Sequence, residues 1–174
     1  MVGLFIGMSS VKAEKVPVYM ITREGCPACE TALKYFKRLD RNNSNLIDLV
    51  VLKVFDKEWN FVSDDLETMY NEIYSLIGAD PAMAQTPTIV IGDYNVQGFP
   101  KDESVVYDAI IDYQKNPSED KIKNIAKEND INLDSIKEDI KSPITMYIIL
   151  VLIIMFCGII GLAMLGRIKI KKDD

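Results

Sequence analysis

Two cysteines in the sequence are spaced so that both sulfur atoms can react at one site. Cys26 and Cys29 stand close together, with Pro27 and Ala28 between them. Pro27 suits the first turn of a helix, so the first sulfur is expected near unpaired backbone N–H groups and the positive end of the helix dipole, which favour the reactive thiolate. Cys26 would attack a disulfide in another molecule, and Cys29, one helical turn further on, would displace that molecule and close a disulfide within the pair.

A Cys-x-x-Cys pair alone also fits half of a zinc site, an inert structural disulfide or a chance occurrence. Zinc needs further ligands, yet the chain has no histidine and its third cysteine, Cys157, lies in an apolar stretch where it serves as a small apolar residue. We therefore expect no metal. A structural disulfide stays open as an alternative. Because histidine is absent, any chemistry has to be carried by cysteine, carboxylates, lysine or tyrosine.

The residues on both sides of the cysteines predict a strand, a helix and a second strand. Val16–Thr22 indicates a buried strand, and Arg23–Gly25 connects it to the cysteines. Apolar residues then recur at helical spacing as far as Leu39, until the polar run Asn42–Asn45 ends the pattern. Leu46–Phe55 is rich in branched residues and indicates a strand inside a sheet. Two strands joined through a helix are expected to pair in parallel.

The following stretch predicts a second helix, a β-hairpin and a third helix. The second helix opens at Ser63-Asp64, where Glu67 completes a capping box begun by Asp64, and Gly78 closes it. The sequence Thr-Pro-Thr at 86–88 leads into the hairpin. The hairpin strands are expected at 89–91 and 96–99, its turn at 92–95, and the third helix at about 103–114.

This order of elements resembles the thioredoxin and glutaredoxin family over residues 16–115. The resemblance implies an α/β fold with a central mixed four-stranded sheet flanked by helices, and a catalytic role for Cys26 and Cys29. In that family the proline before the third strand is cis and faces the cysteines, which maps onto Pro87; Thr86 would then present its backbone to a substrate as an added strand does. Alternatively, Pro87 merely begins an edge strand. The expected substrate-binding residues are Pro27, Ala28, Thr86 and Pro87.

The sequence also departs from the family's pattern around the cysteines. Gly25 stands where thioredoxins usually carry a tryptophan, and Trp59 is far off in sequence. The first strand offers no buried carboxylate, so proton transfer to Cys29 is unassigned; Glu24 and Glu30 are more simply surface carboxylates. The Pro-Ala pair between the cysteines lacks both the histidine of strongly oxidising relatives and the Gly-Pro of reducing thioredoxins. The direction of electron flow stays open.

The C-terminal part of the sequence predicts a membrane anchor. No charged residue occurs from Ser142 to Gly166, and the apolar run Ile144–Leu165 is about 22 residues, or about 33 Å as a helix, long enough to span a bilayer. We predict a single transmembrane helix at 143–166. The tail at 167–174 is basic, and short basic flanks stay cytoplasmic, so the preceding domain would lie outside.

Two further segments flank the domain. Residues 1–13 contain a short apolar run and small residues typical of a cleavage site, which predicts a signal peptide that is short or truncated at its start. Residues 116–142 are rich in charged residues but keep apolar ones at helical intervals. They predict an amphipathic helical linker or extension, which either docks on the domain or forms a stalk.

These features lead to one functional expectation and two alternatives. A net charge of −6 without a basic patch excludes nucleic acid as an expected partner. We expect a membrane-anchored thiol-disulfide oxidoreductase that acts on extracytoplasmic protein thiols and disulfides, with its own disulfide as the only redox group and an unidentified redox partner protein. The alternatives are a substrate-capturing subunit of a membrane complex and a cytosolic disulfide reductase anchored by its tail.

Overall fold

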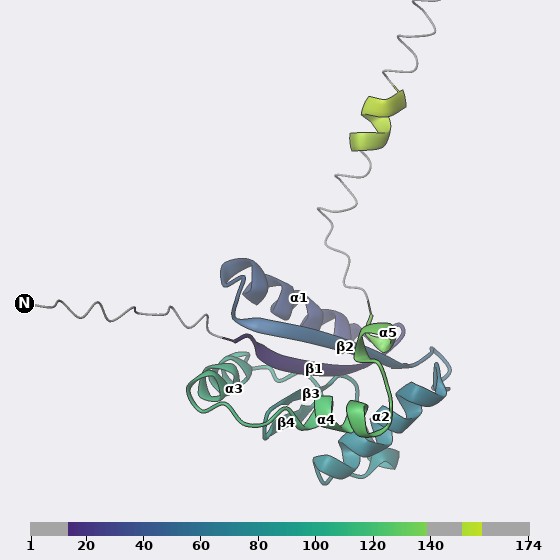
Figure 1. Cartoon of the computed structure of the whole chain (residues 1–174), viewed down its shortest axis with the longest axis vertical. Coiled ribbons are helices and arrows are strands. Elements are labelled where there is room, and N and C mark those ends of the chain that lie inside the picture. Colours follow the sequence, from purple (N-terminus) through teal and green to yellow (C-terminus); the bar gives the residue numbers. More distant parts are fainter. Residues whose placement is uncertain (1–13, 139–150, 158–174) are drawn as a thin grey trace, which may run out of the picture. The chain divides into compact units, whose positions relative to one another are not determined.

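The branched-residue runs on both sides of the cysteines form neighbouring strands of one mixed sheet. The computed structural model describes residues 14–138 and 151–157. The strands are β1 (Val16–Arg23), β2 (Ile47–Phe55), β3 (Thr88–Ile91) and β4 (Tyr94–Gln97). β1 pairs in parallel with β2 and antiparallel with β3, and β3 and β4 form an antiparallel hairpin. The order β2-β1-β3-β4 is visible in Figure 1, and the predicted mixed four-stranded sheet is confirmed.

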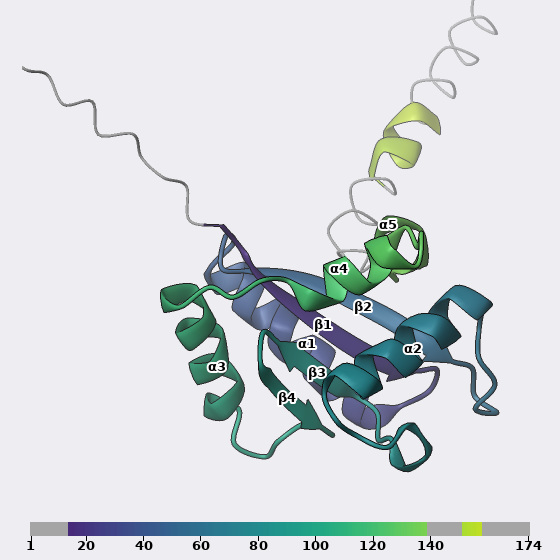
Figure 2. The same ribbon diagram turned by 60° about the horizontal axis from the view of Figure 1, so that its bottom comes forward.

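Helices cover both faces of this sheet. In chain order they are α1 (Pro27–Asn42), α2 (Asp64–Leu76), the short 3₁₀ helix η1 (Pro81–Met83), α3 (Ser104–Lys115), α4 (Lys121–Glu128) and α5 (Leu133–Ile136). Figure 2 shows α2 and α4 in front of the sheet and α1 behind it. A mixed four-stranded sheet flanked in this way fits the thioredoxin-like fold that the resemblance implies.

β1 lies in the middle of the core because its side chains are buried on both faces of the sheet. Tyr19 and Ile21 join one apolar cluster with residues of β2, α2 and α4. Val18 and Met20, which alternate with them along the strand, are 0% and 1% exposed. A strand that is apolar on both faces needs a covering layer on each side, which explains the central position of this run.

The start of α2 differs from the predicted capping box. Ser63 is the N-cap, and its hydroxyl accepts the backbone N–H of Leu66 at 3.3 Å. Glu67 therefore stands one position beyond the place that a capping box requires, and that prediction is wrong. Ser63 and Asp64 are both good N-cap residues, so the sequence alone does not decide between them.

The hairpin also differs from its prediction in where the second strand begins. β4 starts at Tyr94 and pairs with β3 from there, two positions earlier than the predicted start at Val96. Only Gly92 and Asp93 remain for the turn, and Gly92 adopts a φ of +57°, as a two-residue hairpin turn demands. The longer predicted turn was wrong because Tyr94 and Asn95 continue the ladder.

The charged segment after α3 docks on the domain as far as Glu138. Ile122, Ala126 and Ile131 are buried in the same cluster as Tyr19. Beyond α5, the backbone N–H of Glu138 donates to the carbonyl of Val51 at 2.8 Å, on the outer edge of β2. Of the two possibilities that the sequence leaves open, docking is the one observed for these residues. Residues 139–142 lie outside the described part.

The chain divides into two compact units, Met1–Glu138 and Asp139–Asp174. In the second unit only 151–157 is described, as a short helix with exposed apolar side chains. Among the described residues, no helix has the length and apolar character needed to cross a bilayer. Most of the predicted transmembrane helix at 143–166, the predicted signal peptide at 1–13 and the basic tail at 167–174 lie outside the described residues.

Candidate active site

The backbone after β1 turns sharply so that Cys26 begins α1. The N–H of Glu24 still bonds to the carbonyl of Phe55 on β2, at 3.0 Å, and Gly25 then reverses the chain with a φ of +70°. A residue with a side chain is disfavoured at that φ, which accounts for glycine where thioredoxins usually carry tryptophan. Cys26 follows as the N-cap of α1, with Pro27 at the first helical position, as the sequence predicts.

The sulfur of Cys26 takes the place that a serine or aspartate oxygen usually has in an N-cap. The backbone N–H of Cys29 donates to Cys26 Sγ at 3.1 Å. This is one of the helix N–H groups that has no partner within the helix. In the reduced protein the same N–H, together with the helix dipole, stabilises negative charge on Cys26 Sγ, which is the condition for a reactive thiolate.

Cys26 and Cys29 are joined by a disulfide, and their Cα atoms lie 5.2 Å apart. Both residues are nearly buried, at 5% and 6% exposure, while Pro27 and Ala28 between them are exposed. The structure thus brings the two predicted catalytic residues into one bond at a helix N-terminus. Pro27 and Ala28 form the exposed surface beside it.

The loop before β3 brings the other predicted residues to the disulfide. The Thr86–Pro87 peptide bond is cis, as the resemblance implies, and Pro87 is buried. The Thr86 hydroxyl donates to Cys26 Sγ at 3.5 Å, and the Thr86 carbonyl oxygen lies 3.5 Å from the same sulfur. β3 lies between β1 and β4 in the sheet, so Pro87 does not begin an edge strand. The loop thus places Thr86 against Cys26, with the cis-bonded Pro87 next to it in the chain.

Buried hydroxyl groups hold this loop in position. The Thr88 hydroxyl donates to the carbonyl of Gln85 at 2.7 Å and accepts from the hydroxyl of Tyr74 at 2.5 Å. Burial raises the pKa of Tyr74. Tyr74 stays protonated at neutral pH and supports the loop as a neutral donor. No pattern in the sequence marks Tyr74 or Thr88 for this role.

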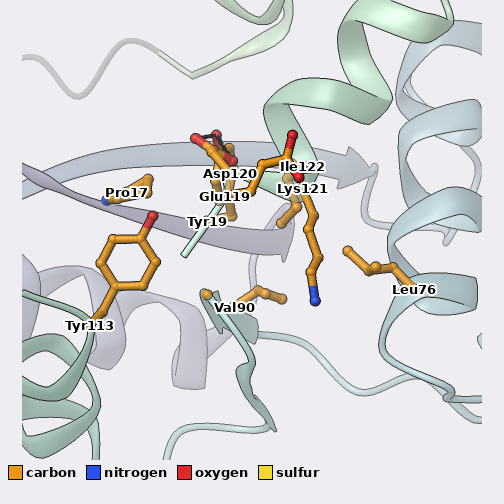
Figure 3. Close-up of a pocket in the computed structure, with 10 residues that line it drawn as sticks. Pro17, Tyr19, Leu76, Val90, Tyr113, Glu119, Asp120, Lys121 and Ile122 are labelled. Carbon is orange, nitrogen blue, oxygen red and sulfur yellow. Dashed lines mark hydrogen bonds between the residues drawn. The ribbon is translucent and has the colours of Figure 1, made fainter. Parts of the chain in front are cut away.

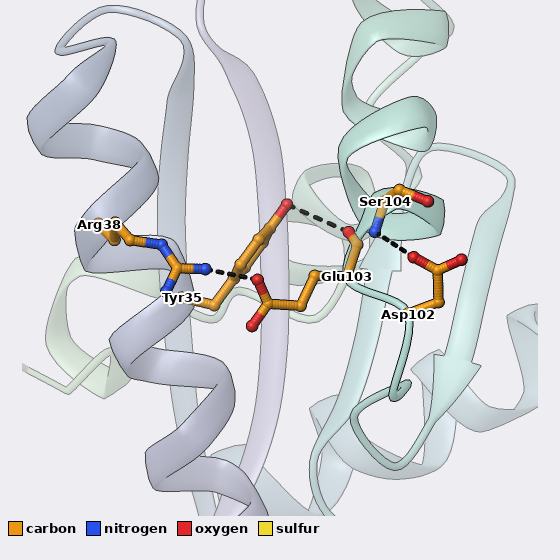
Figure 4. A network of polar contacts seen from close by, with 5 residues as sticks. All are labelled: Tyr35, Arg38, Asp102, Glu103 and Ser104. Atoms are coloured by element: carbon orange, nitrogen blue, oxygen red, sulfur yellow. Dashed lines mark hydrogen bonds and ion pairs between the residues drawn. The ribbon is translucent and has the colours of Figure 1, made fainter.

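A second network ties α1, which carries the cysteines, to the loop before α3 (Figure 4). The hydroxyl of Tyr35 donates to the backbone carbonyl of Glu103 at 3.4 Å, and Arg38 forms an ion pair with the Glu103 carboxylate. Asp102 accepts the backbone N–H of Ser104 at 3.0 Å at the start of α3. Burial, and then the charge of Glu103, raise the pKa of Tyr35 to about 12. These contacts fix the orientation of α1 relative to α3.

Charged and aromatic residues around the site make contacts that the sequence does not predict. Glu24 forms an ion pair with Lys57 at 3.5 Å, and Glu30 is an exposed residue in the first turn of α1. The Arg23 guanidinium lies 4.4 Å from the centroid of the Trp59 ring. Trp59 is thus next to the segment that leads into the cysteines. The positive φ that its loop needs leaves no signal in the sequence.

The described residues contain no cluster of histidine, cysteine or acidic side chains that could hold a metal.

A small pocket at the opposite edge of the sheet does not belong to this site (Figure 3). It lies among Pro17, Gly92, Tyr113 and the start of α4. Within it, the Tyr19 hydroxyl donates to the Asp120 carboxylate at 2.8 Å, and burial, followed by the charge of Asp120, raises the pKa of Tyr19. Asp120 also caps α4, so the pair serves to attach α4 to the sheet.

Comparison with known proteins finds similarity only among solved structures. No protein-family model matches the chain, and no curated protein matches it. A glutaredoxin from Archaeoglobus fulgidus is 21% identical with a TM-score of 0.40, over 55% of this chain and 86% of its own. The protein AGR_C_4864 from Agrobacterium tumefaciens is 20% identical with a TM-score of 0.44, over 60% of this chain and 47% of its own. At these values the likeness carries no conclusion about activity or substrate.

Proposed function

We propose that the chain is a thiol-disulfide oxidoreductase that exchanges disulfides in other proteins through Cys26 and Cys29. The observation that carries the proposal is the position of the Cys26 sulfur. It caps α1, accepts the N–H of Cys29 at 3.1 Å and lies 3.5 Å from the Thr86 hydroxyl. Two donors and a helix dipole directed at one sulfur atom favour its thiolate, and an inert disulfide has no need of them.

The reaction proceeds by two exchanges in which electrons balance. The Cys26 thiolate attacks a substrate disulfide, forms a Cys26–substrate disulfide and releases the other substrate sulfur as a thiolate. The Cys29 thiolate then attacks Cys26 Sγ, closes the Cys26–Cys29 bond and releases the reduced substrate. The substrate gains two electrons, and the pair loses them. In the reverse direction the pair oxidises a substrate dithiol. A redox partner protein that exchanges electrons with the pair returns it to its starting state, and no cofactor beyond the disulfide takes part.

Thr86 supplies the main-chain groups for binding the substrate next to Cys26. Its carbonyl oxygen lies 3.5 Å from Cys26 Sγ. The Thr88 hydroxyl stabilises this loop by donating to the carbonyl of Gln85. An extended substrate segment that pairs with the backbone of Thr86 would bring its own sulfur to Cys26. Pro27 and Ala28, which are exposed beside the disulfide, border the same surface.

We further propose that the domain lies on the extracytoplasmic side of a membrane, anchored by the apolar segment at 143–166. The apolar length of that segment and the basic residues that follow it support this arrangement. A variant in which the three native cysteines are serine and exposed Lys101 is cysteine tests it in intact cells. Labelling by a membrane-impermeant maleimide is expected at residue 101 and not in the matched variant Asp174→Cys. The opposite pattern would favour the tail-anchored cytosolic reductase.

Activity is tested with the full-length chain in mild detergent. Reduced wild type is expected to accelerate the reduction of a small disulfide by dithiothreitol. Cys26→Ser abolishes this turnover, whereas Cys29→Ser stops after one exchange and accumulates a mixed disulfide at Cys26. A wild-type chain that forms the mixed disulfide but never turns over would favour the substrate-capturing subunit. A Cys26 that does not react at all would refute both functions.

A further inference from the structure

The loop that follows β2 lies beside the residues that lead into the cysteines. β2 runs parallel to β1, so both strands end at the same edge of the sheet, and Arg23 is paired with Phe55 there. Beyond that pair, the side chain of Lys57 is the neighbour nearest to Gly25, 3.9 Å from the position of a Cβ atom. The loop therefore borders the entrance to the disulfide, and it contains Trp59, the single tryptophan of the sequence.

Trp59 is held in an unfavourable backbone conformation with its side chain half exposed. Its φ is +68°, a region that a bulky residue rarely adopts, and its exposure is 49%. The Asp56 carboxylate fixes the turn by accepting the backbone N–H groups of Glu58 and Asn60, at 2.9 and 2.8 Å, and the Asn60 side-chain amide at 3.0 Å. Strain that surrounding contacts maintain at the edge of a reactive site points to a role in ligand contact.

Further apolar side chains stand exposed on the same side of the disulfide. The ring of Phe61 packs against Tyr70, with 5.5 Å between centroids, and the Tyr70 hydroxyl donates to the carbonyl of Pro81 at the start of η1. The loop after β2 and the η1 loop are thereby joined over Tyr70. We call their exposed apolar residues the apolar rim, which consists of Trp59, Phe61, Val62 and Met83.

The charge around the apolar rim is negative. Glu58, Asp64 and Asp65 are exposed carboxylates next to rim residues in the chain. Lys57, in the same loop, forms an ion pair with Glu24, and the Arg23 guanidinium lies against the Trp59 ring. A segment with an apolar side chain and neighbouring basic residues therefore complements the rim in both character and charge.

We propose that the apolar rim determines substrate specificity by binding an extended segment of the substrate protein that carries an apolar side chain near its cysteine, flanked by lysine or arginine. This inference rests on the proposed function, because it concerns the same exchange at Cys26. Trp59 supplies the main contact surface, since a large ring held over a guanidinium offers contact area at little cost in side-chain entropy. Asp56 acts as a positioning residue through the turn.

The test follows one exchange with chromogenic peptides. The full-length Cys29→Ser chain is reduced and mixed with short peptides whose single cysteine is disulfide-bonded to thionitrobenzoate. The Cys26 thiolate attacks the peptide sulfur, a Cys26–peptide disulfide forms and coloured thionitrobenzoate leaves. One peptide carries leucines near its cysteine with lysines outside them, a second has serine for leucine, and a third has glutamate for lysine. Each rate is divided by the rate with Ellman's reagent, which removes differences in the reactivity of Cys26 itself.

The leucine–lysine peptide is expected to react about tenfold faster than the serine or the glutamate peptide, as one buried apolar contact or a reversed charge allows. Adding Trp59→Ala or Asp56→Ala removes most of the preference for leucine, and Trp59→Phe keeps most of it. The control Tyr107→Ala changes nothing, because this residue has 40% exposure but lies on α3. The fluorescence of Trp59 shifts when the leucine peptide is attached to Cys26.

Three results would overturn the inference, and they differ from one another. Equal normalised rates for all peptides, with Ellman's reagent still reacting, would reject the specificity role and leave the proposed function intact. A self-associating chain that Trp59→Ala makes monomeric, without a change in peptide preference, would assign the rim to a second copy. No reaction with Ellman's reagent or any peptide would reject the proposed function as well.

Discussion

The Cys26 sulfur receives hydrogen bonds from two donors, and one of them can be removed by substitution. The hydroxyl of Thr86 donates at 3.5 Å, so Thr86→Val keeps the shape of the side chain but loses the donor. A long hydrogen bond to charged sulfur contributes about 0.5–1 kcal/mol, and we expect alkylation of Cys26 by iodoacetamide at neutral pH to slow about twofold to fivefold. The rate is measured on the reduced full-length Cys29→Ser chain.

A threonine in the same helix provides the control for this prediction. The Thr31 hydroxyl donates to the carbonyl of Pro27 at 3.1 Å and not to either cysteine sulfur. Thr31→Val is therefore expected to leave the alkylation rate unchanged. Equal rates for Thr86→Val and the parent chain would mean that the backbone N–H of Cys29 and the helix dipole stabilise the thiolate without the hydroxyl.

At this scale the sequence predicts the reactive residues well and their neighbours poorly. Cys26, Cys29 and Pro87 belong to local patterns that keep their meaning wherever the chain folds in this way. Arg23 and Trp59 come from separate loops, and their stacking depends on the parallel pairing of β1 and β2 together with a positive φ at Trp59. No pattern in the sequence marks such a contact.

Among the elements, α4 is attached to β1 by a hydrogen bond and to the turn between β3 and β4 by the ion pair of Lys121 with Asp93 at 2.7 Å. The Tyr19 hydroxyl donates to Asp120, whose carboxylate also accepts the N–H of Lys123 at the start of the helix. Tyr19→Phe leaves the half-buried Asp120 carboxylate without this donor, and we expect the free energy of unfolding to fall by about 1–3 kcal/mol, with faster amide hydrogen exchange in α4. Denaturant titration and hydrogen exchange on the oxidised chain measure the two effects.

A tyrosine of the same pocket serves as the comparison. Tyr113 donates to the backbone carbonyl of Ser118 at 2.7 Å, a bond between neutral groups, so Tyr113→Phe is expected to cost less and to leave exchange in α4 nearly unchanged. If both variants behave alike, the bond from Tyr19 does not hold α4, and its attachment rests on the buried Ile122 and Ala126 and on the Lys121–Asp93 ion pair. The sequence predicts such apolar residues by their spacing, but the partner of Asp120 lies far away on β1 and has no signal.

For the whole domain, buried tyrosines make stability depend on alkaline pH. Burial raises the pKa of Tyr19, Tyr35 and Tyr70, the last two to about 12. The folded state then holds these protons more tightly than the unfolded chain, whose tyrosines titrate near about 10. Stability is therefore fully present below that pH and falls above it, by up to about 1.4 kcal/mol per pH unit for each such tyrosine.

Unfolding titrations across this range check the prediction, with Tyr19→Phe as the internal comparison. The variant is expected to lose stability less steeply above about pH 10, because one of the tyrosines with a raised pKa is gone. A stability that is flat to about pH 12, or that rises there, would contradict the burial of these hydroxyl groups.

The most direct test of the central claim is the reduction potential of the Cys26–Cys29 pair in the full-length chain. The chain is equilibrated in defined dithiol or glutathione buffers, free thiols are alkylated, and the oxidised fraction is read by mass spectrometry. We predict one two-electron transition between about −270 mV, typical of a reductase, and about −120 mV, typical of an oxidase. A pair that never forms the disulfide, or one that stays oxidised below about −300 mV as structural disulfides do, would contradict the account.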